Sequence, residues 1–333
     1  MRHQKKRWFA ALLSLCMLLS ILPSTSIAFS ESEETWSGNR RKQTIDGGTH
    51  TITLSNLTID SPGVEKSAID ITGNADVTFI LEGNNTLRGY RNHPAIWVES
   101  GSSVTFEGNG LLEASAGGAS IGLGAAGIGG GYGASSNFGN ITINGGTIIA
   151  RGSGGGAGIG GGYEVGSGTV TGNVTINGGY VTAIGGSSGS TGGAGIGSGE
   201  NANYSGTVTI NGGVVYAEGG ADSTSIGRGN RAIGTSDNGA FTTGTGGNAV
   251  IVAPDGIGDP SGFADWDGIF ISYEGNNTSA TVGEDGTVHL NDTEANIQVW
   301  GEPVIDYPLV VESGTELRVV QNDRNYAYAT LEI

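Results

Sequence analysis

The segment Ala-Gly-Ile-Gly-Gly-Gly-Tyr occurs twice in this sequence, and its repetition constrains the fold more than any other feature. It occupies residues 126–132 and 157–163, and a third version, Ala-Gly-Ile-Gly-Ser-Gly-Glu, occupies residues 194–200. Glycine accounts for 64 of the 333 residues, far above the usual level of about 7%. Collagen is excluded because glycine is not found at every third position. Disorder is not indicated either, because apolar residues recur among the glycines at fixed places.

A second motif follows each glycine segment along the chain. It is Asn-Ile-Thr-Ile-Asn-Gly-Gly from residue 140, Asn-Val-Thr-Ile-Asn-Gly-Gly from 173 and Thr-Val-Thr-Ile-Asn-Gly-Gly from 207, with a more divergent copy from 103. Its last isoleucine is Ile143, Ile176 or Ile210, so the period is 33 to 34 residues. Periods of this length are typical of proteins that stack one structural unit on the next.

The pattern within one unit predicts β-strands and turns. Residues 141–144 alternate apolar and polar side chains, Asn-Gly-Gly is a turn sequence, and the alternation resumes at Ile148. Three short strands per unit, with one variable loop, predict an all-β, right-handed parallel β-helix. We expect the isoleucine of each glycine segment to point inward and to stack on its equivalents: Ile69, Ile96, Ile128, Ile159, Ile196 and Ile226.

Four segments are expected along the chain. Residues 1–28 begin with basic residues, continue with an apolar run and end with small residues typical of a cleavage site, which together indicate a secretory signal peptide. The alternative, a membrane anchor, is disfavoured because the apolar run is short. Residues 29–43 are expected to be a linker, 44–238 the repeat β-helix, and 239–333 either continued irregular β coils or a small β cap. The predicted location is secreted, extracellular or associated with the cell surface, with no membrane insertion after signal cleavage.

The charge of the chain argues against two classes of partner. The net charge is −17, and four of the basic residues lie in the predicted signal peptide, so the rest of the chain carries −21. Nucleic acids and anionic membrane surfaces are therefore not expected as partners. The single cysteine, Cys16, also lies in the predicted signal peptide, so disulfides are not expected.

The sequence resembles a group of secreted and surface proteins of Gram-positive, clostridial-type bacteria. The stretches that carry the resemblance are residues 67–89, the Ala-Gly-Ile-Gly-Gly-Gly and Ile-Thr-Ile-Asn-Gly-Gly repeats, and residues 246–270. Together they extend over most of 44–320. The resemblance implies a pectate-lyase-like (pectin lyase-like) β-helix of a kind often described as carbohydrate-binding. It assigns no functional residue through any short motif.

Outward aromatic side chains are the predicted ligand-binding residues, because rings flanked by polar groups suit sugars. Aligning the units gives three outward columns: Leu111/Thr147/Tyr180/Val214, Glu113/Ile149/Thr182/Tyr216 and Ser115/Arg151/Ile184/Glu218. We expect Tyr180 and Tyr216 to share a face, with Arg151 and Glu218 at its rim. Tyr132 and Tyr163 should lie one unit apart at equivalent places. The alternative is that these rings only cover the core and stack on each other.

Four aspartates close together form the candidate metal site, for calcium. They are Asp255, Asp259, Asp265 and Asp267, and the alternative is a plain acidic loop, since the spacing is not that of an EF-hand. Arg228 and Arg231 suggest either a clamp for uronate carboxylates or a solvated turn. No catalytic residue is predicted, because the histidines are scattered. A column of Thr-x-Asn sequences is expected to reflect strand and turn chemistry rather than an ice-binding plane.

Three functions remain open at the level of sequence. The first is a non-catalytic carbohydrate-binding or adhesive surface protein that recognises a polysaccharide or cell-surface glycan along the β-helix face. The second is a polysaccharide lyase or glycoside hydrolase on the same fold, since one fold hosts many functions. The third is a structural surface spacer. The repetition, the negative charge, the predicted export and the aromatic columns favour the first, and calcium is the only cofactor that the sequence suggests.

Overall fold

The computed structural model describes residues 34–60, 66–118, 123–133, 136–166, 168–230, 238–243, 249–258, 268–273, 280–282, 287–290, 295–300, 309–311 and 317–321. The chain divides into two units, Met1–Ser32 and Glu33–Ile333, and every described residue belongs to the second. The predicted signal peptide lies outside the described residues.

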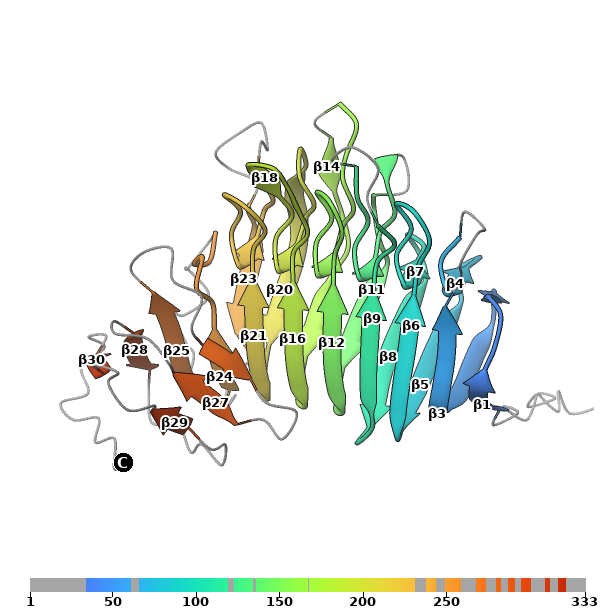
Figure 1. Ribbon diagram of the computed structural model, residues 1–333, viewed down its shortest axis with the longest axis horizontal. Coiled ribbons are helices and arrows are strands. Elements are labelled where there is room, and N and C mark those ends of the chain that lie inside the picture. Colours follow the sequence, from blue (N-terminus) through green and yellow to red (C-terminus); the bar gives the residue numbers. More distant parts are fainter. Residues whose placement is uncertain are drawn as a thin grey trace, which may run out of the picture. The chain divides into compact units, whose positions relative to one another are not determined.

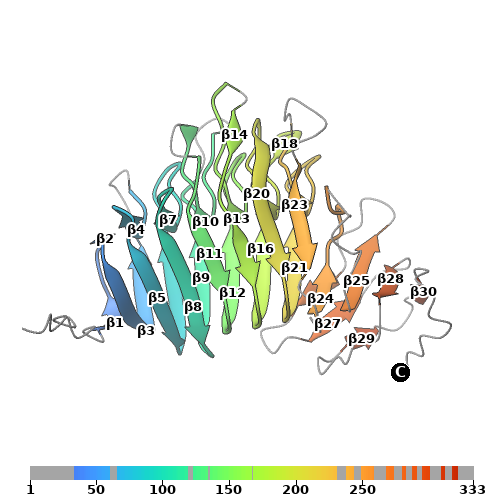
Figure 2. The ribbon, with the colours of Figure 1, turned by 180° about the vertical axis from the view of Figure 1, so that it is seen from behind.

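The described residues form β-strands and no α-helix, and the strands line up in three parallel rows (Figures 1 and 2). The first row contains β3 (Thr49–Asp60), β5 (Asp76–Glu82), β8 (Ser103–Gly108), β11 (Asn140–Ile143), β15 (Val174–Ile176), β20 (Asn203–Ile210) and β23 (Asn238–Thr243). Neighbours in this row pair in parallel.

The second row follows the Asn-Gly-Gly turns. It contains β6 (Asn84–Arg88), β9 (Leu111–Ser115), β12 (Thr147–Arg151), β16 (Tyr180–Ile184), β21 (Val214–Glu218), β24 (Ala249–Val252) and β25 (Gly268–Tyr273), all paired in parallel. The first two rows belong to one 18-stranded sheet, because the long strand β3 pairs with both β5 and β6.

The third row is a separate seven-stranded parallel sheet made largely by the glycine segments. Its strands are β2 (Gln43–Asp46), β4 (Ile69–Thr72), β7 (Ile96–Val98), β10 (Ile128–Gly129), β13 (Ile159–Gly160), β19 (Ile196–Gly197) and β22 (Ile226–Gly227). The predicted isoleucine stack is confirmed, since the six isoleucines pair in register and are at most 1% exposed.

Close approach between neighbouring strands explains the glycine after each isoleucine. Gly129, Gly160 and Gly197 have φ between 127° and 137°, where residues with a side chain are strained. A Cβ on these glycines would lie 1.8 to 2.1 Å from the carbonyl oxygen of the next glycine in the row. The segment also closes on itself, because the amide of Ala157 donates to the carbonyl oxygen of Gly161 at 2.9 Å.

The interior is filled by the alternate side chains of the first two rows. In the first row, Val104, Ile141, Val174 and Val208 form one inward column; in the second row, Leu112, Ile148, Val181 and Val215 form another. Their polar neighbours point outward. This two-residue alternation is what a parallel sheet with one buried face requires.

The N-terminal boundary of the folded region differs from the sequence prediction. Residues 34–39, expected within a linker, form β1 (Glu34–Asn39), which pairs with β3. The physical reason is Trp36, which is 4% exposed and packs its ring 6.2 Å from that of Phe79. Burial of one tryptophan side chain is enough to hold a polar segment against the first full unit.

From β25 onward the strands continue, but parallel and antiparallel pairs are mixed. β25 pairs antiparallel with β28 (Ala295–Trp300), which pairs with β30 (Leu317–Gln321). A small sheet consists of β26 (Ala280–Val282), β27 (Val288–Leu290) and β29 (Leu309–Val311), and β26 contacts β21. The remaining short strands are β14 (Thr169–Val170), β17 (Ser187–Ser188) and β18 (Thr191–Gly192).

Candidate functional site

The three outward columns predicted on the second row have the expected register. Thr147, Tyr180 and Val214 pair in sequence, as do Ile149, Thr182 and Tyr216, and Arg151, Ile184 and Glu218. Tyr180 and Tyr216 therefore belong to neighbouring strands and adjacent columns. Arg151 is exposed, and it lies two strands away from Glu218.

The side chain of Tyr216 does not lie open to solvent, which corrects the expectation of a shared tyrosine face. Tyr216 is 5% exposed, and its hydroxyl donates to Oε2 of Glu218 at 2.7 Å. Val214 in the next column is fully buried, and β26 packs against this strand. Because the C-terminal strands cover this part of the row, Tyr180 is the half-exposed member of the pair.

Tyr132 and Tyr163, at the ends of two glycine segments, form a stacked aromatic pair. Their ring centroids are 5.8 Å apart with an angle of 24° between the planes, and both side chains are partly exposed. The amide of Gly133 donates to the carbonyl oxygen of Tyr163 at 2.9 Å, which fixes the separation of the two backbones. Gly155 leaves space beside the pair, since a Cβ there would lie 2.9 Å from Cδ2 of Tyr163.

Polar groups surround this aromatic pair. The Ser136 hydroxyl donates to the Glu164 carboxylate. Glu164 also donates its amide to the carbonyl oxygen of Glu200 at 3.1 Å, and Asn201 Nδ2 donates to the carbonyl oxygen of Glu164 at 3.3 Å. We call Tyr132, Tyr163, Ser136, Glu164, Glu200 and Asn201 the tyrosine cluster.

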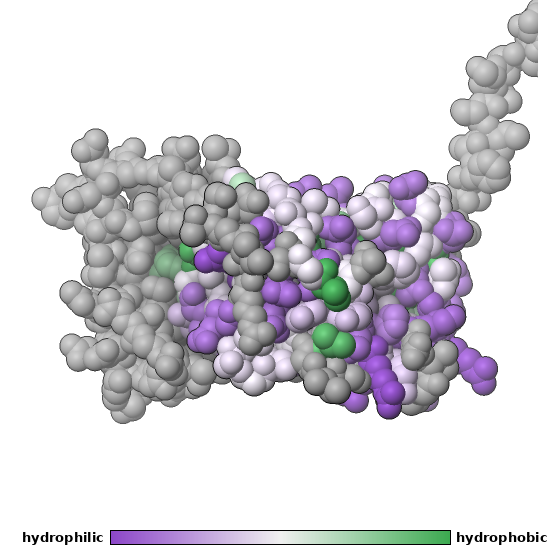
Figure 3. Space-filling view, turned by 90° about the horizontal axis from the view of Figure 1, so that it is seen from above, coloured by the Kyte–Doolittle hydropathy of each residue, from purple (hydrophilic) through white to green (hydrophobic). Residues whose placement is uncertain are grey.

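The surface around the β14 end carries few hydrophobic side chains. Seen from above that end, it is mainly hydrophilic or neutral with small hydrophobic spots (Figure 3). Val165, next to Glu164, is 58% exposed, while Glu200 is 3% exposed. The two rings, the half-exposed Glu164 and the exposed Val165 are a combination that can contact both the C–H and the hydroxyl groups of a sugar.

Ser136, Glu164, Glu200 and Asn201 were not predicted as site residues. A signal for Glu200 exists in the sequence, because it replaces tyrosine in the third glycine segment. The same backbone hydrogen bond recurs from unit to unit, with the amides of Gly133, Glu164 and Asn201 as donors and the carbonyl oxygens of Tyr163, Glu200 and Asn230 as acceptors. Tyr163 and Glu200 are therefore equivalent positions in neighbouring units. Ser136 and Glu164 come together only because loops of adjacent units lie side by side.

Two carboxylates predicted for different roles, Glu218 and Asp255, come together at the end of β21. Asp255 Oδ2 accepts from the amide of Gly219 at 2.9 Å, and the amide of Asp255 donates to Oγ of Ser225 at 2.9 Å. Partial burial raises the pKa of Asp255 above its usual value, and the charge of Glu218 raises it further. The hydrogen bonds from Gly219 and Ser225 act in the opposite direction.

The calcium site that the sequence suggested lies mostly outside the described residues. Asp259, Asp265 and Asp267 lie outside the described residues, so Asp255 is the only one of the four aspartates that can be placed. No group of three or more histidine, cysteine, aspartate or glutamate side chains in the described segments is arranged to hold a metal ion.

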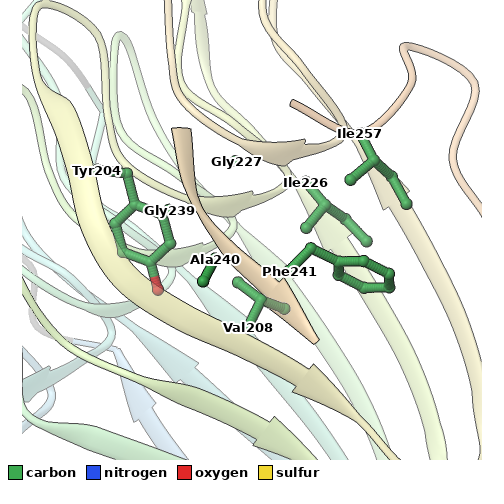
Figure 4. A pocket seen from close by; sticks show the side chains of 8 residues that line it. All are labelled: Tyr204, Val208, Ile226, Gly227, Gly239, Ala240, Phe241 and Ile257. Carbon is green, nitrogen blue, oxygen red and sulfur yellow. The ribbon is translucent and has the colours of Figure 1, made fainter. Parts of the chain in front are cut away.

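The apolar pocket near Tyr204 belongs to the interior and not to a ligand site (Figure 4). It is lined by Tyr204, Val208, Ile226, Gly227, Gly239, Ala240, Phe241 and Ile257, and it has no room for a water molecule. The Tyr204 hydroxyl donates to the carbonyl oxygen of Gly172 at 2.9 Å, and its ring stacks on Phe138 at 6.3 Å. Burial raises the pKa of this hydroxyl far above its usual value.

Of the two arginines suggested as a uronate clamp, Arg228 alone lies among the described residues. Arg228 is half-buried, and its backbone carbonyl accepts from the Thr224 hydroxyl at 2.9 Å. Arg231 lies outside the described residues.

The fold and the site define an all-β protein with long parallel sheets and an aromatic–carboxylate cluster at one end of its units. No protein-family model, curated protein or solved structure matches this chain. Among the described residues, no helix is long and apolar enough to cross a membrane.

Proposed function

We propose that this protein is a secreted, right-handed parallel β-helix that binds a polysaccharide without cleaving it, through the tyrosine cluster. The observation that carries the proposal is the partial exposure of the stacked Tyr132 and Tyr163 rings, next to the half-exposed Glu164. The signal-peptide pattern of residues 1–28 supports export. The register of the three rows and the period of the sequence support the β-helix.

The chemistry of a sugar suits such a site. A pyranose presents C–H groups on its faces, which pack on aromatic rings, and hydroxyls at its edges, which donate to carboxylates. Adjacent units repeat at about 4.8 Å, the spacing of paired strands. A long glycan can therefore make several weak contacts at once, and their sum gives useful retention.

Retention on insoluble polysaccharides tests the proposal directly. The double variant Tyr132→Ala/Tyr163→Ala should be retained about tenfold more weakly, the effect of losing two ring contacts. Tyr180→Ala is the matched control, because Tyr180 is similarly half-exposed but lies on the second row. Retention that is lost in the control and kept in the double variant would place the site on the second row instead.

The pair Glu218 and Asp255 favours a second candidate function, a polysaccharide lyase or glycoside hydrolase. A carboxyl with a raised pKa beside an ionised one is the arrangement that general acid catalysis uses. Release of unsaturated or reducing oligosaccharides by the wild-type protein, abolished in Asp255→Asn, would establish this activity. Absence of such products from a panel of plant and bacterial polysaccharides would leave the non-catalytic proposal in place.

A further inference from the structure

A threonine occupies the same outward position on every strand of the first row. The register pairs Thr51, Thr78, Thr105, Thr142, Thr175, Thr209 and Thr242 in succession. All seven side chains are half-exposed. Figure 2 shows this row of strands side by side. With a strand spacing of about 4.8 Å, the threonine column is roughly 29 Å long.

Columns of small polar residues flank the threonines on both sides in the middle of the row. On one side lie Ser103, Asn140, Asn173 and Thr207; on the other lie Glu107, Asn144, Asn177 and Asn211. We call these columns and the threonines between them the threonine face. Residues two apart on a strand are about 6.7 Å apart, so the face is a regular grid.

Hydrogen bonds between the asparagines hold the grid in place. Asn211 Nδ2 donates to Asn177 Oδ1 at 2.7 Å, and Asn177 Nδ2 donates to Asn144 Oδ1 at 2.8 Å. On the other side, Asn173 Nδ2 donates to Asn140 Oδ1 at 3.1 Å. Each of these bonds uses one N–H of a donor amide, and an amide has two. Asn173 and Asn177 are exposed, so their second N–H can reach a partner at the surface.

The threonine hydroxyls between the amides are available to solvent as well. At one end Thr209 and Thr242 share a hydrogen bond of 2.7 Å. For Thr105, Thr142 and Thr175, no hydroxyl bond to another group is found within the described segments. Each threonine therefore offers one hydroxyl and one methyl group at a fixed interval.

The charge of the threonine face differs from that of the whole chain. The chain carries a net charge of −17, whereas the three columns as defined above contain one ionisable residue, Glu107, and Asp76 pairs with Ser103 at the edge of the face. A neutral face rich in hydrogen-bonding groups complements a partner that is itself neutral and rich in such groups. Ions, nucleic acids and charged lipid surfaces do not meet that description.

The Thr-x-Asn sequences by themselves indicate only strand and turn chemistry, but the structure places seven threonines in register across one row. From this register we propose that the threonine face binds the surface of ice. Ice is a neutral lattice of donors and acceptors with a fixed period, and a regular grid of hydroxyl, methyl and amide groups can order water into a matching layer. Water-mediated hydrogen bonds are enthalpically close to direct ones, and many equivalent contacts add along the grid. The inference does not depend on the proposed polysaccharide binding, which uses other residues.

A polysaccharide chain fits the threonine face less well than ice does. The three columns contain no aromatic side chain, whereas sugar recognition commonly relies on rings and on a few unevenly placed polar groups. Here the groups are evenly placed and nearly identical from strand to strand. Such uniformity suits a partner that is itself periodic in two directions.

The experiment compares two double variants with the wild-type protein. Thr142→Lys/Thr175→Lys places two long cations in the middle of the threonine face. Thr147→Lys/Thr182→Lys is the matched control, since these threonines are also half-exposed but point outward from the second row. Each purified protein is assayed for incorporation into a slowly growing ice hemisphere and for inhibition of recrystallisation in a frozen sucrose solution. Circular dichroism and the melting temperature verify folding.

The wild-type protein and the control are expected to enter the ice and to slow grain growth. The threonine-face variant should remain folded, and its incorporation into ice and its inhibition of recrystallisation should both fall at least about tenfold. Should that variant misfold, Thr142→Val/Thr175→Val, which keeps the shape, replaces it. Wild-type protein that is excluded from ice like serum albumin would overturn the inference, as would full activity in a folded threonine-face variant. Loss of binding to microcrystalline cellulose by that variant, without ice binding by the wild type, would assign the face to a glycan and also overturn it.

Discussion

Replacing Gly160 with alanine should be far more destabilising than replacing Gly166, although both glycines have a positive φ. Gly160 has φ 135°, and its added Cβ would lie 1.9 Å from the carbonyl oxygen of Gly197. Gly166 has φ 101°, and an added Cβ there meets nothing within 4 Å. The pair therefore separates the cost of the backbone conformation from the cost of the close approach.

The expected magnitudes follow from these two contributions. The backbone strain of a residue with a side chain at such a φ is about 1–3 kcal/mol, and Gly166→Ala should cost that much. In Gly160→Ala the strand β19 must also move by more than 1 Å to reach an ordinary contact distance, or the pairing must break. Overpacking of this kind adds about 1–3 kcal/mol, so the total loss is about 2–6 kcal/mol.

Urea unfolding followed by circular dichroism measures the difference. The midpoint of Gly160→Ala should fall well below that of Gly166→Ala, with equal slopes if both unfold in one transition. Gly197→Ala, whose Cβ would lie 1.8 Å from the carbonyl oxygen of Gly227, should match Gly160→Ala. Equal midpoints for Gly160→Ala and Gly166→Ala would refute the argument that strand contact, rather than φ, requires glycine in this row.

Three further predictions concern buried groups. Ile159→Asp places a carboxylate in the isoleucine stack, where the native side chain is 0% exposed. It should lower the melting temperature by more than about 10 °C, because an unpaired buried charge is costly. A melting temperature near that of wild type would contradict the stack. Tyr204→Phe leaves the carbonyl oxygen of Gly172 without its donor and should cost about 1–3 kcal/mol in urea unfolding, whereas no loss would show that water replaces the hydroxyl. Because the pKa of Asp255 is raised in the folded state, its contribution to stability falls as pH rises from about 4, the usual value, through the raised one. Asp255→Asn should flatten that part of the stability curve, and an unchanged slope between pH 4 and 7 would exclude Asp255 as its source.

The strands, the turns and the inward isoleucines could be predicted from the sequence because they are local and periodic. Apolar and polar side chains alternate every two residues in 141–144, which predicts a strand with one buried face. The 33–34-residue period predicts which positions stack on each other. Equivalent positions then had to pair, so the columns through Tyr180 and Arg151 have the predicted register. Periodicity carries no such information for segments that occur once, which is why the sequence predicts a linker where β1 is found.

The exposure of each predicted site residue was decided by the tertiary structure. Tyr180 and Tyr216 have the same local pattern, yet Tyr216 is buried because β26, about 65 residues later in the chain, packs against its strand. Glu218 and Asp255 lie 37 positions apart and meet through the amide of Gly219. The sequence determined which side chains point outward, since that depends on neighbours along one strand. Whether an outward side chain is open to solvent depends on segments from elsewhere in the chain, and only their packing decides it.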